Sequence, residues 1–359
     1  MTNTPLPSIP KSDTTTAHED GLNVAPTRLS SAMTRADWYG GVMCRVNNKF
    51  RMKYTVTPGL YALDDPDRDS PVLVTGNYRL SLNVLRSSLP KRNAWILVVD
   101  TKGINVWCAA GKGTFCTNEI VKQVTACNLK SRISHHTLIL PQLGASGVSA
   151  PKLQKVSGFT AKFGPVHASD IPAYLENNCI ATPAMRRVRF SIFDRAKIVP
   201  MEAIPALKTL GLFLLITAVL FGITRTGIMY KQALTGVWPL VIAGVIALFT
   251  GSILTPLLLP FIPVRAFSLK GFVTGLIGTI TVISLSPICR RTPLMTAFCL
   301  VSVPAFSSYL SFLFTGSSTY TSPSGVKAEL KIAWPLYRAG AAISAVLLVL
   351  VILSLWGVL

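Results

Sequence analysis

The chain carries at residues 103–115 the sequence Gly103-Ile104-Asn105-Val106-Trp107-Cys108-Ala109-Ala110-Gly111-Lys112-Gly113-Thr114-Phe115. This stretch follows the apolar run Ala94–Asp100, whose length and β-branched residues predict a buried strand. It therefore starts at the carboxyl end of a strand, where open α/β sheets bind their ligands. One cysteine lies between a tryptophan and three small residues, and small residues let a large flat ligand approach the backbone.

Residue types alone leave two interpretations of Cys108 open and exclude a third. A free cysteine is commonly a small buried hydrophobe, so Cys108 can be a structural residue in a tight turn. It can equally be a soft ligand presented to a metal that a flat cofactor holds. A phosphate loop is excluded by spacing, because it requires glycine at 106 and a hydroxyl at 113, where Val106 and Gly113 stand.

Strand and helix patterns alternate from residue 71 to about residue 200. Each of four apolar strand segments precedes a segment with helical periodicity, and this order predicts a Rossmann-like α/β domain with a parallel sheet. The turns after the strands should then gather on one rim of the sheet. Short edge strands are expected before this region, including one over Phe50–Val56. The predicted strands are 72–75, 94–100, 137–140 and 159–163, and the predicted turns are 75–81, 103–113, 141–147 and 164–168.

Composition indicates a membrane protein in the second half. Half of the residues are hydrophobic, 14% are charged, and the mean hydropathy is +0.47. The domains predicted are a disordered leader at 1–35, a soluble domain at 36–200 and an all-α membrane domain of five helices at 206–359. The predicted spans are 207–224, 237–259, 271–289, 294–315 and 338–359.

The net charge and the cysteine spacing limit the kinds of binding partner and metal site that the sequence predicts. The net charge of +20 favours an anionic neighbour such as the lipid bilayer or an acidic protein, and the sequence has no nucleic-acid-binding motif. The bias of Lys and Arg between loops places the soluble domain in the cytoplasm and the C-terminus outside the cell (inner) membrane. The seven cysteines include no Cys-x-x-Cys pair, so neither zinc, disulfides nor an iron–sulfur cluster is predicted.

The octapeptide Asn105–Lys112 resembles the signature of the corrinoid protein of mercury methylation, a family related to the large subunit of the corrinoid iron–sulfur protein. The resemblance extends to residues 75–81, 140–150 and 164–172. It covers the chain from about Trp38 to the C-terminus, including a membrane domain.

This resemblance implies the chemistry. Cys108, on a cap helix, is the catalytic residue and the metal ligand, binding the cobalt of cobalamin from its lower axial side. The cofactor in its methylcob(III)alamin form transfers methyl to Hg(II) and gives methylmercury. The family implies a ferredoxin-like iron–sulfur partner as electron donor and a methyl donor acting through a separate methyltransferase. The cofactor-binding residues implied are Thr75, Tyr78, Ser81, Asn105, Val106, Trp107, Cys108, Ala109, Ala110, Gly111, Lys112, Gln142, Gly144, Ala145 and Ala168.

Two other functions stay open. One is a membrane-anchored corrinoid methyl carrier for another acceptor. The other is a five-span transport protein with a cytoplasmic regulatory domain, which acidic residues inside the spans or a true phosphate loop would favour; the sequence shows neither. Cys299, inside a predicted span, and Cys289, near a boundary, are either ordinary packing residues or soft sites for mercury.

Overall fold

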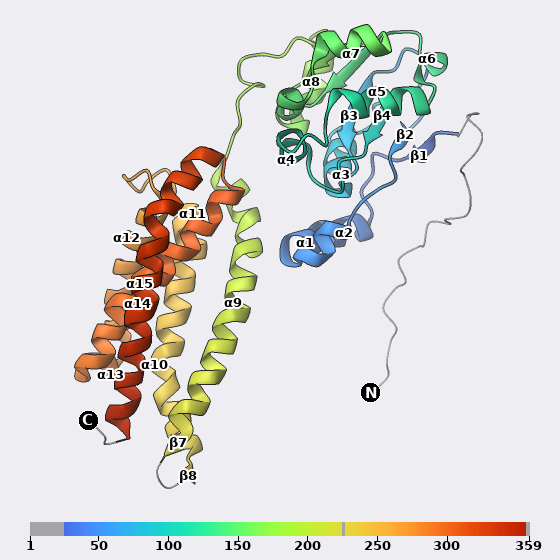
Figure 1. Cartoon of the computed structure of the whole chain (residues 1–359). Coiled ribbons are helices and arrows are strands. Elements are labelled where there is room, and N and C mark those ends of the chain that lie inside the picture. The colour runs from blue at the N-terminus through green and yellow to red at the C-terminus, as the bar shows by residue number, and fades with distance from the viewer. Residues whose placement is uncertain (1–24, 225–226, 357–359) are drawn as a thin grey trace, which may run out of the picture. The chain divides into compact units, whose positions relative to one another are not determined.

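The computed structural model of the chain describes residues 25–224 and 227–356 (Figure 1). These residues form two compact units. The first contains the chain up to Asp37 together with Tyr54–Arg186, and the second contains Trp38–Lys53 together with the chain from Arg187 onward. Residues 38–53 and 187–200 of the predicted soluble domain, 36–200, group with the helices of the second unit.

The first unit contains a six-stranded mixed sheet with the order β1-β2-β4-β3-β5-β6. Strands β3, β4, β5 and β6 run parallel, as predicted, whereas β2 runs antiparallel to β4 and β1 runs parallel to β2. Strand β2 precedes residues 71–200, for which the parallel sheet was predicted, and the short segment 64–71 connects it to β3. A parallel connection needs a crossover of a dozen or more residues. The strands are β1 Thr27–Leu29, β2 Gly59–Leu63, β3 Val72–Gly76, β4 Ala94–Val99, β5 Thr137–Leu140 and β6 Thr160–Phe163.

Helices pack on both faces of this sheet, as expected of a Rossmann-like arrangement. Successive residues of a strand point to opposite faces. Accordingly, Leu97 and Val99 join a core with residues of α4, α5 and α7, while Ile96 and Val98 join a second core with residues of α3 and α8. The elements are α3 Arg79–Ser87, α4 Val106–Gly111, α5 Thr117–Ala126, α6 Leu129–Arg132, η1 Gln142–Gly147, α7 Ala150–Ser157, η2 Ala168–Asp170 and α8 Ile171–Glu176.

Two predictions for the first 60 residues are wrong. The strand expected over Phe50–Val56 is replaced by helix α2, Asn48–Lys53, because the Asn47 side chain caps it by accepting a hydrogen bond from the Phe50 N–H at 3.1 Å. The predicted leader does not extend to residue 35, since Thr27–Leu29 pairs with β2 and helix α1 spans Arg35–Val46. Residues 1–24 of that leader lie outside the described residues.

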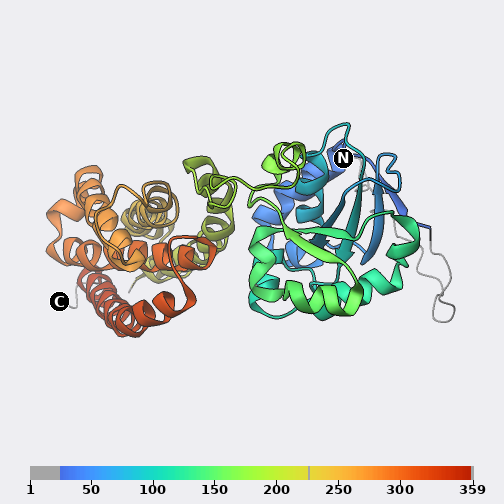
Figure 2. The ribbon, with the colours of Figure 1, turned by 90° about the horizontal axis from the view of Figure 1, so that it is seen from above.

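In the described residues of the second unit, five helices are long and apolar enough to cross a membrane, in agreement with the number predicted (Figures 1 and 2). The first begins earlier than predicted, because Ser191 and Asp194 form a capping box at the start of α9. A π-helical turn, Phe249–Leu254, follows α10 Tyr230–Leu248 and precedes α11 Thr255–Leu257. The spanning helices are Ile192–Gly222, Tyr230–Leu257, Phe267–Leu285, Pro293–Ser317 and Ser324–Ser354.

Candidate functional site

The loop that leads to the cysteine stretch is fixed by the buried side chain of Asn77, which follows β3. The Asn77 carboxamide oxygen accepts hydrogen bonds from the N–H groups of Thr101 and Gly103, each at 3.0 Å. Its amide nitrogen donates to Asp100 at 3.1 Å. One side chain therefore joins the carboxyl ends of β3 and β4. Asn77 lies in the segment 75–81, where the sequence analysis assigned roles to Thr75, Tyr78 and Ser81 but not to Asn77.

The loop then turns sharply at Lys102 and Gly103, whose φ angles are 58° and 71°. The Lys102 ammonium donates to the Asp100 carboxylate at 2.8 Å, and this hydrogen bond holds the pKa of Asp100 below its usual value. Asp100 thus stays ionised and bonded to both Asn77 and Lys102 near neutral pH. This local network sets the direction in which the chain enters α4.

Helix α4 presents Cys108 at the border between core and solvent. The Asn105 side chain caps the helix by accepting a hydrogen bond from the Cys108 N–H at 2.9 Å. Val106, Ala109 and Ala110 are buried, whereas the Trp107 side chain is 45% exposed and Cys108 is half-buried. The cap and the buried face together fix the backbone of Cys108.

Small residues in this region serve two different purposes. Helix α4 packs closely on η1, and a Cβ added at Gly144 would lie 2.5 Å from Phe115 Cε1 and 3.1 Å from Val106 Cγ1. Ala109 and Ala110 also face the core, so packing explains their size. A Cβ at Gly111, in contrast, would have no heavy atom within 4 Å among the described residues. Within α4, Gly111 is therefore the small residue with open space beside it.

The other predicted cofactor residues fall into two groups. Gln142, Gly144 and Ala145 belong to η1, beside α4, and the Gln142 side-chain oxygen Oε1 accepts a hydrogen bond from Arg186 at 2.7 Å. Tyr78 and Ser81 lie at the start of α3, and Ala168 lies in η2, which packs on α3 and α8. Both groups follow the carboxyl ends of parallel strands. Thr75 is buried within β3, and Lys112 is exposed at the end of α4.

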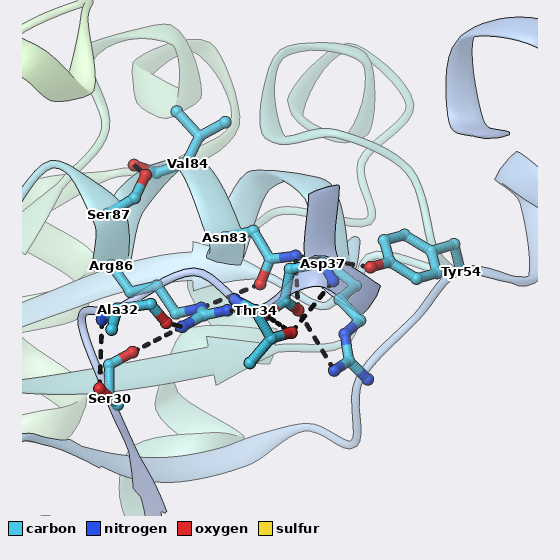
Figure 3. A network of polar contacts seen from close by, with 10 residues as sticks. Ser30, Ala32, Thr34, Asp37, Tyr54, Asn83, Val84, Arg86 and Ser87 are labelled. Atoms are coloured by element: carbon cyan, nitrogen blue, oxygen red, sulfur yellow. Dashed lines mark hydrogen bonds and ion pairs between the residues drawn. The ribbon is translucent and has the colours of Figure 1, made fainter. Parts of the chain in front are cut away.

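Helix α3 is anchored by a buried ion pair on the second core (Figure 3). Arg86 donates to the Asp37 carboxylate at 2.6 Å, and both side chains are about 95% buried. Burial raises the pKa of Asp37, but hydrogen bonds from Thr34 and the Arg86 charge outweigh this effect and lower it to about 2. Asn83 donates a further hydrogen bond to Asp37 at 3.2 Å. The network stabilises the helix that carries Tyr78 and Ser81 at its start.

Sequence reasoning missed a polar cavity of about 450 Å³ where the N-termini of α5 and α7 meet. The Ser149 N–H donates to the Thr117 hydroxyl at 2.9 Å, which ties the two helix starts together. N–H groups at helix starts favour negatively charged or carbonyl groups, and Lys152 adds a cation. The sequence signal that could have found this cavity is the pair of predicted helix starts, near residues 118 and 150. Its lining residues are Cys116, Thr117, Asn118, Ser146, Gly147, Val148, Ser149 and Lys152.

The side chains of the described residues do not by themselves form a metal site at Cys108. Within residues 25–224 and 227–356, no group of three or more His, Cys, Asp or Glu side chains comes together. Among the same residues the Cys108 sulfur has no hydrogen-bond partner. A single half-exposed thiol beside an open glycine could supply one soft ligand to a metal whose remaining ligands come from a flat cofactor.

Residues 48–175 match the family of CO dehydrogenase/acetyl-CoA synthase delta subunits. The match runs from α2 through α8 and includes α4, η1 and the polar cavity. Of the helical unit, only residues 48–53 lie within the match. The similarity thus covers the candidate site and ends before the first candidate membrane span.

Several archaeal proteins are similar over the same region. The gamma subunit of the acetyl-CoA decarbonylase/synthase complex of Methanopyrus kandleri is 33% identical over 124 residues, which are 34% of this chain and 26% of the relative. The gamma subunit 1 of Methanosarcina thermophila is 32% identical over 132 residues, 36% of this chain and 28% of the relative. The gamma subunit of Methanocaldococcus jannaschii is 31% identical over 130 residues. The chain spans about a quarter of the length of these relatives.

Proposed function

We propose that this chain is a membrane-anchored, cobalamin-dependent methyltransferase that transfers a methyl group to Hg(II) and forms methylmercury. The observation that carries the proposal is Cys108. The Asn105 cap fixes the backbone of Cys108, and its half-exposed thiol lies beside the open Gly111. The segment that carries it is similar to subunits of the acetyl-CoA decarbonylase/synthase complex. The octapeptide resemblance names mercury as the acceptor.

In this proposal the corrinoid, when bound, supplies a cobalt ion that carries the methyl group. Cys108 would hold the cobalt as a thiolate, a soft and strongly donating ligand that would favour loss of the methyl group. Asn105 and Asn77 keep that sulfur in place through the α4 cap and the preceding loop. Gly111 leaves room for a flat ring, and the cavity at α5 and α7 offers N–H groups and Lys152 to polar side arms of the ring.

The proposal includes partners that this chain cannot replace. The sequence has no Cys-x-x-Cys pair, so the electrons needed to reduce the cofactor come from a separate ferredoxin-like iron–sulfur protein. The methyl group arrives through another methyltransferase. The five apolar helices hold the chain in the cell membrane, with the α/β unit in the cytoplasm and the C-terminus outside.

The test uses the full chain purified in detergent and supplied with methylcobalamin, which is the source of the methyl group. Binding is followed by the visible spectrum, and methylmercury is measured after addition of Hg(II) and a reductant. We expect Cys108→Ala to lose the spectral shift caused by thiolate ligation together with methylmercury formation. Cys116→Ala, eight residues away in the neighbouring cavity lining, serves as the matched control and should retain most of both.

The similarity to acetyl-CoA decarbonylase/synthase subunits favours one alternative, a corrinoid methyl carrier for another acceptor. In that case the chain would bind cobalamin through Cys108 and lose its methyl group to a different acceptor, without forming methylmercury. The assay above separates the two functions, because ligation and mercury methylation are measured independently.

A further inference from the structure

Two buried thiols meet inside the helical unit. Cys289 lies on α13, Pro287–Arg291, and Cys299 lies on α14, Pro293–Leu313. Their sulfur atoms are 3.7 Å apart, both side chains are fully buried, and both cysteines are free. The two residues are ten positions apart in sequence, so helical periodicity does not bring them together.

Local hydrogen bonds hold the two thiols in this position. Ser286 caps α13, and its hydroxyl accepts a hydrogen bond from the Cys289 N–H at 3.4 Å. The Thr296 hydroxyl donates to the Cys289 carbonyl, which joins α13 to the first turn of α14. Only Thr292 separates the two helices. The sulfur–sulfur contact is thus built into a tight helix–helix connection.

The surroundings of the pair are apolar. Both cysteines belong to a core cluster with Val282, Met295 and Phe298. In the part of the chain that the structure describes, no third His, Cys, Asp or Glu joins them as a potential metal ligand. A cation bound here would therefore have two thiolates as its charged ligands, in a medium where water does not compete.

We propose that Cys289 and Cys299 form a two-coordinate binding site for a soft, thiophilic cation of the class of Cu(I) and Hg(II). Binding forms two metal–sulfur bonds and releases the two thiol protons. This site is separate from Cys108 and does not depend on the proposed corrinoid function.

The distance between the two sulfur atoms allows both of them to bind one soft metal ion. With metal–thiolate bonds of about 2.3 Å, sulfurs 3.7 Å apart subtend an angle of about 107° at a shared metal. Linear coordination would need sulfurs about 4.6 Å apart, so a linear site requires the two sulfurs to separate by about 0.9 Å when the metal binds. Zn(II) almost always takes four ligands in structural sites, and only two are present, so the pair disfavours it.

The test uses the full chain in detergent, with Cys44, Cys108, Cys116, Cys127 and Cys179 replaced by Ser so that only the pair remains. Hg(II), and separately Cu(I) under reducing conditions, are titrated, with Zn(II) as the comparison metal. We expect one equivalent of each soft cation and two sulfur neighbours in X-ray absorption. Returning Cys44 while replacing Cys289 and Cys299 gives a control with one buried thiol.

Removing either Cys289 or Cys299 from the two-cysteine chain should weaken binding at least about 100-fold, because the second thiolate binds intramolecularly at a high effective concentration. Equal affinity of the single-thiol chains, binding of Zn(II) as tight as that of Hg(II), or no metal uptake by the pair would each overturn the proposal.

A second measurement avoids substitution of the pair. A disulfide reagent should oxidise the two thiols to a disulfide, with transfer of two electrons and two protons to the reagent, and should abolish metal uptake. A thiol reductant should restore it. Unchanged uptake after complete oxidation would show that the metal binds elsewhere and would overturn the proposal.

Discussion

Gly144→Ala tests whether close packing between α4 and η1 holds in place the helix that carries Cys108. The new Cβ would lie 2.5 Å from Phe115 Cε1, about 1 Å less than an ordinary carbon–carbon contact. Val106 Cγ1, at 3.1 Å, blocks an easy shift to the other side. Overpacking of this kind costs about 1–3 kcal/mol, and here the cost falls on the segment that carries Cys108.

The measurement is hydrogen exchange of the α4 amides in the full chain. A loss of about 1–3 kcal/mol should speed their exchange by about 5- to 150-fold if local opening governs it. Gly111→Ala is the matched control, because its Cβ meets no heavy atom within 4 Å, and its α4 amides should exchange at the rate of the unaltered chain. Equal exchange in the two variants would refute the packing argument. Under the proposed function, Gly111→Val should in turn lose cobalamin without faster exchange, whereas Ala110 is buried and does not separate the two effects.

Three further predictions concern the supports of the site and the membrane unit. Asn77→Ala should destabilise the α/β unit by about 2 kcal/mol, measured by thermal melting, since Asp100, Thr101 and Gly103 lose their buried partner; an unchanged melting temperature would contradict this. Because the folded pKa of Asp37 is about 2 against an ordinary 3.8, its stabilisation of about 2 kcal/mol is present above pH 4 and lost as pH falls toward 2. This acid-dependent part should vanish in Asp37→Asn, and a variant with the same pH profile would exclude the ion pair as its source. Residues 1–190 fused to one unrelated span should make methylmercury but release less of it from cells than the full chain, and equal release would reduce the five helices to an anchor.

The strands of the parallel sheet were predictable because their apolar runs are short and bounded by turns. The strand predicted at 137–140 has the same bounds in the structure, Thr137–Leu140, and the predicted 72–75 extends by one residue to Gly76. The antiparallel strand β2 was missed as such because its direction depends on the length of the connection to β3. The helix at Asn48–Lys53 was missed because a local cap from Asn47 outweighs the alternating pattern.

The sequence predicts where the candidate site lies, and this stays a prediction; it does not predict how the residues around Cys108 pack. Cys108 follows from its place after β4 and from the octapeptide. Whether a small neighbour faces a ligand or the core depends on the direction of the helix, which the sequence does not give. Ala109 and Gly144 are accordingly packing residues, and Gly111 alone of the small residues in α4 has open space. The contact between Cys289 and Cys299 could not be predicted from the sequence either, because it depends on how α13 packs against α14.

The most direct measurement is the cobalt spectrum of the full chain with methylcobalamin, the source of the methyl group, recorded for the unaltered protein, Cys108→Ala and Cys116→Ala. The account predicts thiolate ligation in the unaltered protein and in Cys116→Ala, with methylmercury formed by both. It predicts neither property in Cys108→Ala. A Cys108→Ala protein that keeps the thiolate spectrum and forms methylmercury at a near-normal rate would contradict the central claim.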